Sequence, residues 1–418
     1  MKEREDLILK PIPAGDRIGW VAPLFNVLGT NIALSALMVG GTLIGGLTFR
    51  DVILASVIGN LILVAIFMTQ GYIGNREGLN TYVIATGPFG EIGGRWVISL
   101  VLGITSFGWF GIQAGVAGLS VQQIFPGINV TLAIIVLGFL MVIVATFGFK
   151  TMALFNYIAI PPLVLLLIWG VYRSMGMEGA VSLTDYIPTD PITLTTGIDM
   201  VVGMIIVGAI ISPDYLRYTR TFKDVLIVGV VAVGLITVFQ QVAAAAMSVS
   251  APSWDITQVL SDLGFGWIAF FILILAAWST NLSNAYSGGL ALKNVFPNVK
   301  RTTLTLISGT IGTIIAAFGF INLFGDFLGL LSSTVSAIGG IIWVEYYLIQ
   351  KRKLVMRKGV NWLAIIAWVI GIIVANISAN FAFGIGAINS IVTAGIAYYI
   401  LIKLFDKAEI EKRGLPNG

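Results

Sequence analysis

Residues 20–47 read WVAPLFNVLGTNIALSALMVGGTLIGGL, a stretch of 28 residues without a charged side chain. A helix of about 20 consecutive apolar residues crosses a bilayer core, so this stretch is long enough to span it. The surrounding apolar region, from Ile18 to Phe49, is far longer than the apolar core of a signal peptide, and we expect it to stay in the protein. The sequence therefore predicts a first transmembrane helix.

The composition of the whole chain agrees with a bilayer as its surroundings. Of 418 residues, 57% are hydrophobic and 11% are charged, whereas a soluble domain carries about 25% charged residues. A soluble protein with one oversized core is excluded because single cores stop growing at about 250–300 residues. The chain has no cysteine and no histidine, which excludes disulfides, Cys/His metal sites, thiol nucleophiles and imidazole proton relays.

Apolar stretches of membrane length recur along the chain, and their backbone must be helical because hydrocarbon offers no hydrogen-bond partners. We predict an all-α membrane protein with about twelve transmembrane helices. They cover residues 20–47, 52–74, 95–122, 129–148, 152–174, 196–216, 223–248, 264–291, 301–323, 327–349, 361–379 and 382–404. The connection 74–95 is longer than a simple turn, and we expect it to hold a short amphipathic helix against the membrane surface.

Lysine and arginine indicate the orientation because they collect in cytoplasmic loops. If the N-terminus is cytoplasmic, 22 of the 24 basic residues fall in inside segments, and only Arg50 and Arg173 lie outside. The net charge of +4 then follows from topology and requires no nucleic acid. We expect a multi-pass protein of the cytoplasmic (inner) membrane with both termini cytoplasmic. Its expected parts are an N-terminal segment 1–19, a transporter core 20–350, two further helices 351–405 and a cytoplasmic tail 406–418.

Two glycine-bearing spans point to a central site. Residues 25–31, FNVLGTN, place Gly29 between two asparagines in the first span, and Gly203 and Gly208 lie in the sixth. Helices interrupted by glycine in corresponding positions of two halves mark the binding site of a transporter. The two spans correspond if helices 1–5 and 6–10 are inverted repeats. We predict broken helices at both places; the alternative is glycines that allow close helix packing.

Polar residues are few within the predicted spans. Trp109 and Gln113 of the third span are four residues apart, so they share one helical face. An indole face and an amide with donors and an acceptor suit a planar heterocycle. The alternative is a packing tryptophan with a glutamine bonded to a neighbouring backbone. Gln240 and Gln241 of the seventh span are expected to bond other helices.

The eighth span contains the sequence AAWSTNLSN at 276–284, whose polar side chains are costly in a membrane unless they line a cavity or pair together. The hydroxyls of Ser279 and Thr280, with carbonyls freed by a broken first helix, form a plausible oxygen cage for Na⁺. The alternative is a hydrogen bond from each hydroxyl to a carbonyl one turn earlier, which explains Asn281 and Asn284 less well.

At these positions the sequence resembles the nucleobase:cation symporter-1 family, and within it the bacterial cytosine permeases. The resemblance covers most of the chain. Its motifs are Leu28-Gly29, Gly40-Gly41-Thr42-Leu43, Ile58-Gly59-Asn60, Gly71-Tyr72-Ile73-Gly74, Gly108-Trp109-Phe110-Gly111, Asp214 before Arg217, and Trp278-Ser279-Thr280-Asn281.

The resemblance implies a LeuT-like fold of two inverted five-helix repeats plus two C-terminal helices, with alternating access. It implies that Trp109 stacks on the substrate, and that Gln113 matches the substrate-binding glutamine of the related hydantoin transporter. The Na⁺ ligands carried over from the family are carbonyls of Gly29, Ile32 and Ala276 and hydroxyls of Ser279 and Thr280.

The sequence also departs from the cytosine permeases in the sixth and eighth spans. Ile205 falls where the family has a second stacking aromatic residue, Met204 and Val207 fall on serines, and Ala276 falls on an asparagine. A pyrimidine-like solute is still expected, but cytosine itself is in question. The substrate-binding residues that we predict are Trp109, Gln113, Gly203, Met204, Ile205, Gly208, Asn281 and Asn284.

These observations predict a secondary active transporter that imports a nucleobase-like heterocycle with a cation, Na⁺ in the first instance. The alternatives within transport are proton coupling and a thiamine-precursor or hydantoin-type substrate. A channel would show pore-lining rings, and an enzyme would show a nucleophile–base or metal constellation; the sequence offers neither. We expect no cofactor besides the coupling ion, no nucleic acid and no protein partner.

Overall fold

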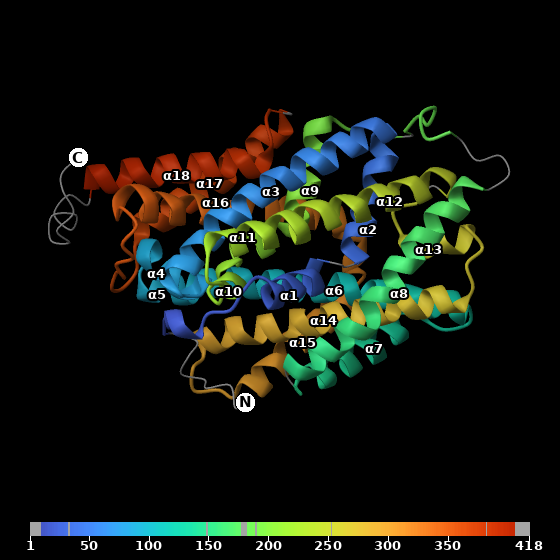
Figure 1. Ribbon diagram of the computed structural model, residues 1–418, viewed down its shortest axis with the longest axis horizontal. Coiled ribbons are helices and arrows are strands. Elements are labelled where there is room, and N and C mark those ends of the chain that lie inside the picture. Colours follow the sequence, from blue (N-terminus) through green and yellow to red (C-terminus); the bar gives the residue numbers. More distant parts are fainter. Residues whose placement is uncertain are drawn as a thin grey trace.

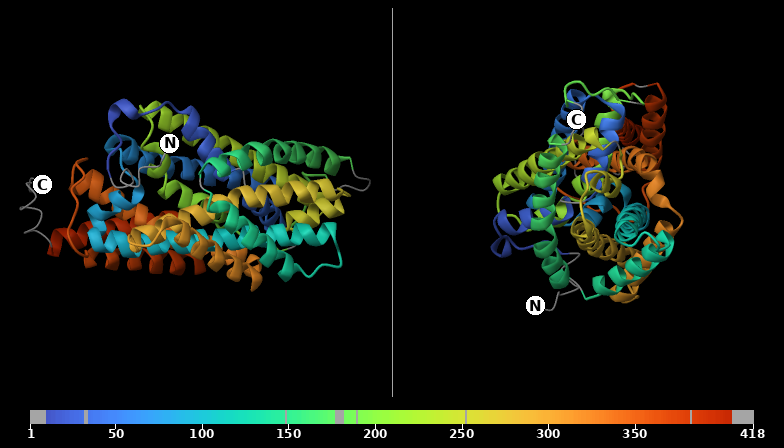
Figure 2. Two further views of the ribbon diagram at one scale, coloured as in Figure 1. Left: turned by 90° about the horizontal axis from the view of Figure 1, so that it is seen from below. Right: turned by 90° about the vertical axis from the view of Figure 1, so that its right-hand side faces the viewer.

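The computed structural model describes residues 10–31, 34–147, 149–176, 182–188, 190–251, 253–381 and 383–405, with the side chains of 149–157 left out. Among the described residues, the regular secondary structure is helical, apart from one isolated bridge between Ile18 and Thr219. Most of the long helices run along the longest axis of the molecule (Figure 1), and the end-on view of Figure 2 shows them down their axes.

The first half of the chain forms the elements that correspond to the first five predicted spans. These are η2 (Ala14–Asp16), α1 (Val21–Asn31), α2 (Leu34–Gly46), α3 (Phe49–Glu77), α4 (Thr81–Phe89), α5 (Glu91–Gly93), the π-helical η3 (Gly94–Ile98), α6 (Ser99–Ile124), α7 (Val130–Ala145) and α8 (Phe149–Met175). The axes of α1 and α2 are bent by 52° at the break between them. The first span is therefore bent directly after Asn31; α1 itself runs through Gly29, and residues 32 and 33, between the two helices, lie outside the described residues.

The second half provides the remaining seven spans. Its elements are α9 (Leu194–Ile210), α10 (Pro213–Leu216), α11 (Phe222–Val228), the π-helical η4 (Gly229–Leu235), α12 (Ile236–Ser250), α13 (Ile256–Asp262), α14 (Trp267–Val295), α15 (Arg301–Ala317), η5 (Phe320–Leu323), α16 (Phe324–Trp343), the π-helical η6 (Val344–Ile349), α17 (Trp362–Asn380) and α18 (Gly386–Phe405).

The helices follow the predicted spans in order. Among the described residues, eight helices are long and apolar enough to cross a membrane, and the bent pair α1–α2 provides a ninth span. The helices α7, α9 and α15 have 16 or 17 residues and occupy three further predicted spans. The prediction of an all-α membrane protein with about twelve helices is confirmed.

The contacts between helices have the pattern of two inverted five-helix repeats. Spans 1 to 5 are α1–α2, α3, α6, α7 and α8, and spans 6 to 10 are α9, α11–α12, α14, α15 and α16. Span 2 packs on span 6 (α3 on α9), and span 7 packs on span 1 (α12 on α2). Span 9 packs on span 3 (α15 on α6), and span 4 packs on span 8 (α7 on α14). Each pair becomes the other when the repeats are exchanged. The appended helices α17 and α18 pack on α16.

The predicted break in the sixth span at Gly203–Gly208 is wrong. Helix α9 runs through both glycines, and the chain turns at Ile211 and Ser212 before Pro213 begins α10. A Cβ atom at Gly203 would overlap the carbonyl oxygen of Leu328, so this glycine allows close packing of α9 on α16. The residues between the two glycines are apolar and offer no partner for backbone groups that a break would expose.

The connection 74–95 contains a helix, but this helix is not a surface element. In α4, seven of the nine residues are buried, and the helix packs against α16 and α17. Asn80 caps its N-terminus by accepting a hydrogen bond from the backbone N–H of Val83 (2.9 Å). The expectation of an amphipathic helix on the membrane surface is therefore wrong.

Candidate functional site

Trp109 of α6 lies against the first turns of α16. Its ring centroid is 5.3 Å from that of Phe327 and 6.4 Å from that of Phe324, in edge-to-face arrangements. A Cβ atom on the neighbouring Gly108 would lie only 2.6 Å from the Phe327 ring, so α6 and α16 are in close contact here. The indole is half-buried and has an aromatic cover on its α16 side.

Gln113 lies one helical turn beyond Trp109 and is 1% exposed. Within the described part of the chain, neither its side-chain nitrogen nor its side-chain oxygen has a hydrogen-bond partner. A buried polar group without a partner costs about 1–3 kcal/mol, and such groups in native proteins call for an explanation such as a ligand. The alternative in which Gln113 bonds a neighbouring backbone finds no support in this arrangement.

Residues of α9 meet the same part of α16 from the other side. Gly203 packs on the backbone of Leu328, the residue after Phe327. Met204 and Ile205 are buried beside it. The α6 and α9 positions predicted from the sequence therefore converge on the segment 324–328. At Gly208, further along α9, an added Cβ atom would meet the Ile205 side chain at 3.8 Å, an ordinary contact.

Sequence analysis missed the aromatic cover itself. Phe324 falls in the predicted connection between the ninth and tenth spans, and Phe327 and Leu328 begin the tenth; neither position gives a sign of its contacts. The one local signal is Gly319, whose φ of 79° starts a short 3₁₀ turn, η5, ahead of α16. Glycine adopts such a left-handed conformation without strain, and the turn directs the start of α16 over Trp109.

Asn281 and Asn284 of α14 are used in packing. The Asn281 amide donates to the carbonyl oxygen of Phe110 (3.1 Å) and lies 3.4 Å from the sulfur of Met141. Its oxygen accepts a hydrogen bond from Asn284 (3.1 Å). Donor and acceptor of Asn281 are both engaged between α14, α6 and α7, so we leave these two residues out of the proposed substrate contacts.

The expected cation ligands lie on helices that touch each other. Helix α1, which carries the buried Gly29, contacts α14, on which Ala276, Ser279 and Thr280 are buried. The Thr280 hydroxyl donates to the carbonyl oxygen of Ala276 (3.1 Å), as the alternative of intrahelical bonding predicts for this residue. Ile32 lies outside the described residues. The ligand set therefore stays a prediction.

The broken end of α1 is supported by span 7. The Gln240 amide donates to the carbonyl oxygen of Asn31 (3.3 Å), and the Asn31 amide donates to the carbonyl oxygen of Ala232 in η4 (3.4 Å). Gln241 accepts a hydrogen bond from Asn60 of α3 (2.9 Å). The prediction that both glutamines bond other helices is confirmed. Because these bonds satisfy groups that the break exposes, the first helix can be interrupted inside the membrane.

The segment before α1 connects spans 1, 2 and 6 at one end of the molecule. The Ile12 amide donates to the carbonyl oxygen of Gly78 (2.9 Å), at the end of α3. The Ile18 amide donates to the carbonyl oxygen of Tyr218 (2.7 Å), and the Arg220 amide donates back to Ile18 (3.0 Å). These bonds link the three spans at this end of the molecule.

Comparison with known proteins agrees with this geometry. Residues 11–401 match the family model described as permease for cytosine/purines, uracil, thiamine, allantoin. The cytosine permease of Escherichia coli (strain K12) is 31% identical over 406 residues, which cover 95% of this chain and 94% of that protein.

The chain belongs to this permease family. The hydantoin permease of Microbacterium maritypicum is 25% identical over 403 residues, 86% of this chain and 81% of that protein. Among solved structures, the inward-facing conformation of Mhp1 matches with a TM-score of 0.84 at 20% identity, covering 96% of this chain and 93% of that one. The relatives are named as permeases, the fold is LeuT-like, and the chain is a multi-pass membrane protein.

Proposed function

We propose that this protein is a secondary transporter that imports a small nucleobase-like heterocycle together with Na⁺ by alternating access. The observation that carries the proposal is Gln113, a buried amide that has no hydrogen-bond partner among the described residues and lies one turn from the indole of Trp109. A monocyclic base offers a flat face to the indole and adjacent donors and acceptors to the amide. Bound substrate would supply the hydrogen bonds that Gln113 lacks.

The segment 324–328 of α16 acts as the cover of this site. It contacts Trp109 through Phe327 and contacts α9 through Leu328. A substrate lying on Trp109 therefore touches an element that must move before the site can open on that side. Gly203, Met204 and Ile205 form the α9 wall, and Ile205 makes this wall aliphatic.

Na⁺ takes oxygen ligands from the broken end of span 1 and from α14 in this proposal. The carbonyl of Gly29 and the hydroxyls of Ser279 and Thr280 are ligands of the required type, and α1 and α14 are in contact. An ion between them stabilises one position of span 1 relative to α14. Coupling follows if substrate affinity differs with and without the ion.

We place the protein in the cytoplasmic (inner) membrane with both termini cytoplasmic, because 22 of its 24 basic residues then lie in inside segments. The parts are the N-terminal segment 1–19, the transporter core 20–350, the two further helices 351–405 and the tail 406–418. The end at which residues 12–18 bond α3 and the 218–220 turn is then the cytoplasmic end.

A hydantoin-type solute is the second candidate substrate. The specific observation is again Gln113, an amide where a small residue is expected for cytosine permeases, together with the similarity to the hydantoin permease. A cyclic ureide presents alternating N–H and C=O groups that a carboxamide can match. The two candidates share the site and differ only in the edge of the ring that is recognised.

Uptake of radiolabelled cytosine and hydantoin into proteoliposomes tests the proposal. An inward Na⁺ gradient should drive accumulation of one of them, and choline in place of Na⁺ should abolish it. Accumulation in choline that follows an inward proton gradient would replace Na⁺ by H⁺ as the coupling ion. No accumulation of either solute under any gradient would contradict the proposed substrate class.

Gln113→Leu separates the substrate role from packing. Leucine replaces an unpartnered buried amide by an apolar side chain of similar size, so the melting temperature should stay equal or rise. Substrate affinity should fall about 10- to 100-fold, because hydrogen bonds worth about 1–3 kcal/mol are lost. The measurement is substrate binding and thermal unfolding of the same purified variant. A lower melting temperature with unchanged affinity would make Gln113 a packing residue.

A further inference from the structure

A cavity that is partly open to solvent lies at the far end of α6 from the segment before α1. Its volume is about 250 Å³, and it is lined by α6, α7, the end of α15, the connection between α15 and α16, and the two residues ahead of α13. Trp254 and Asn322 in its lining are exposed. Ligand pockets for drug-sized molecules measure about 300–1,000 Å³, so this cavity has room for a smaller ligand such as a single ring. In the proposed orientation it faces the outside.

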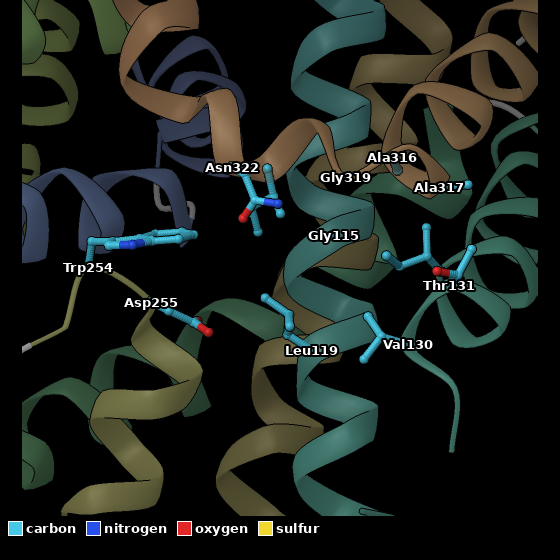
Figure 3. A pocket seen from close by; sticks show the side chains of 12 residues that line it. Gly115, Leu119, Val130, Thr131, Trp254, Asp255, Ala316, Ala317, Gly319 and Asn322 are labelled. Atoms are coloured by element: carbon cyan, nitrogen blue, oxygen red, sulfur yellow. The ribbon is translucent and has the colours of Figure 1, made fainter. Parts of the chain in front are cut away.

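An indole, a carboxylate and a carboxamide lie on one side of this cavity. Figure 3 shows Trp254, Asp255 and Asn322 on that side and Thr131 on the opposite side, with Gly115 of α6 between them. An indole stacks on flat rings, a carboxylate accepts N–H donors, and a carboxamide both donates and accepts. The pair of an indole and a carboxamide also characterises the central site at Trp109 and Gln113.

The Asp255 carboxylate favours a ligand with N–H donors. Burial raises the pKa of Asp255, although hydrogen bonds from the backbone N–H and hydroxyl of Thr257 (2.9 and 2.8 Å) act in the opposite direction. A carboxylate that has lost part of its hydration is stabilised in its charged form by further hydrogen bonds from N–H donors. An anionic ligand would instead be repelled.

The cavity adjoins the segment that covers the central site, and its other wall rests on α2. A Cβ atom at Gly41 of α2 would lie 2.8 Å from the carbonyl oxygen of Ser253, so the backbone ahead of Asp255 rests on α2. Asn322 belongs to the η5 turn, two residues before Phe324, which contacts Trp109. A molecule held between Trp254 and Asn322 therefore touches the turn that leads into the cover of the central site and the backbone that rests on α2.

We propose that this outer cavity is a second binding site, which takes a small neutral planar heterocycle with N–H donors. The inference rests on the proposed function for its choice of ligand, since the transported solute has this chemistry. The cavity would bind it as it arrives from outside, ahead of transfer to Trp109. Trp254 stacks on the ring, and Asp255 and Asn322 bind its edge.

Equilibrium binding of radiolabelled cytosine, and separately of hydantoin, to the purified full-length protein in Na⁺ tests this. The wild-type protein should bind two molecules, the second at least tenfold more weakly. Trp254→Ala and Asp255→Asn should each remove the weaker class and keep the stronger one, which also shows that the variants are folded. Asp262→Asn at the other end of α13 and Trp267→Ala at the start of α14 are the matched controls and should keep both classes.

Trp109→Ala distinguishes failure of this inference from failure of the proposed function. It should remove the stronger class and leave the weaker one. A single class of site that is lost in Trp109→Ala and unaffected in Trp254→Ala and Asp255→Asn would overturn the outer site and leave the central one. Binding that depends on Trp254 and is unchanged in Trp109→Ala would instead contradict the central site. Absence of binding for both solutes would overturn both proposals.

Discussion

Spans 1 and 6 occupy equivalent positions in the two repeats, and both carry glycine at mid-span, yet they are interrupted at different depths. Span 1 bends directly after Asn31, whereas α9 runs through both of its glycines and ends only at Ile210, before the turn that leads to α10. At the end of α1, Asn31 exchanges hydrogen bonds with Gln240 and with the backbone of Ala232. In α9, Gly203 lies against Leu328, and the residues that follow are apolar. Because an interrupted helix exposes backbone groups to a medium without hydrogen-bond partners, glycine alone does not break a membrane helix.

The difference assigns distinct tasks to the two spans. In the proposed mechanism the end of α1 supplies carbonyl ligands to an ion, whereas the apolar face of α9 allows α16 to pack closely beside the substrate site. Four substitutions test this division, and they are ordered from the largest expected effect to the smallest.

Gly203→Val should have the largest effect. A side chain here would overlap the Leu328 carbonyl, so α9 and α16 must separate. Overpacking of this kind costs about 1–3 kcal/mol, and the displaced α16 would no longer cover Trp109. We expect a lower melting temperature in detergent and loss of substrate binding. A variant with normal stability and normal affinity would show that close contact between α9 and α16 is not needed.

Gln240→Leu should have the next largest effect, because it leaves the Asn31 carbonyl without this donor. A buried unpaired group costs about 1–3 kcal/mol, and the position of the α1 end should become less defined. We expect the Na⁺ concentration for half-maximal uptake to rise about tenfold.

The matched control is Gln241→Leu, one residue away on the same helix, which loses its bond from Asn60 instead. It should reduce stability without changing the Na⁺ dependence of uptake. Equal shifts of Na⁺ dependence in both variants would mean that span 7 affects ion binding only through general stability.

The sequence was sufficient to predict the spans because bilayer thickness dictates the length of an apolar run. Trp109 and Gln113 could be selected because polar residues inside a span need a reason. The cover formed by Phe324 and Phe327 could not be predicted, since phenylalanine in an apolar run is ordinary and its partner is distant in sequence. The same holds for α13, a helix of seven residues within a connection.

Two errors have one physical origin. The breaks expected near Gly203 and the surface position expected for α4 were both inferred from residue types along one segment. In each case the packing of other helices decides the outcome, α16 against Gly203 and α16 with α17 against α4. A single sequence records which residues are small or apolar and does not record which neighbour covers them.

Thr280→Val is expected to have a moderate effect. Valine keeps the shape of threonine and removes the hydroxyl, which in this structure bonds the Ala276 carbonyl. If that hydroxyl also binds Na⁺, half-maximal uptake should require about tenfold more Na⁺, with the maximal rate restored at saturating Na⁺. Unchanged Na⁺ dependence would leave the intrahelical bond as the full role of Thr280.

Gly208→Ala should have the smallest effect and is the sharpest test of the comparison. An added Cβ would lie 3.8 Å from Ile205, an ordinary contact, and alanine stabilises a continuous helix by about 1 kcal/mol relative to glycine. If α9 stays continuous throughout the transport cycle, the variant should be slightly more stable and transport at the normal rate. If the helix of span 6 bends or unwinds at this glycine in another state, as span 1 is bent here, the same substitution should slow uptake. Substrate affinity should then be preserved. Thermal unfolding, binding and uptake of this one variant therefore decide whether the two spans differ permanently or only in this conformation.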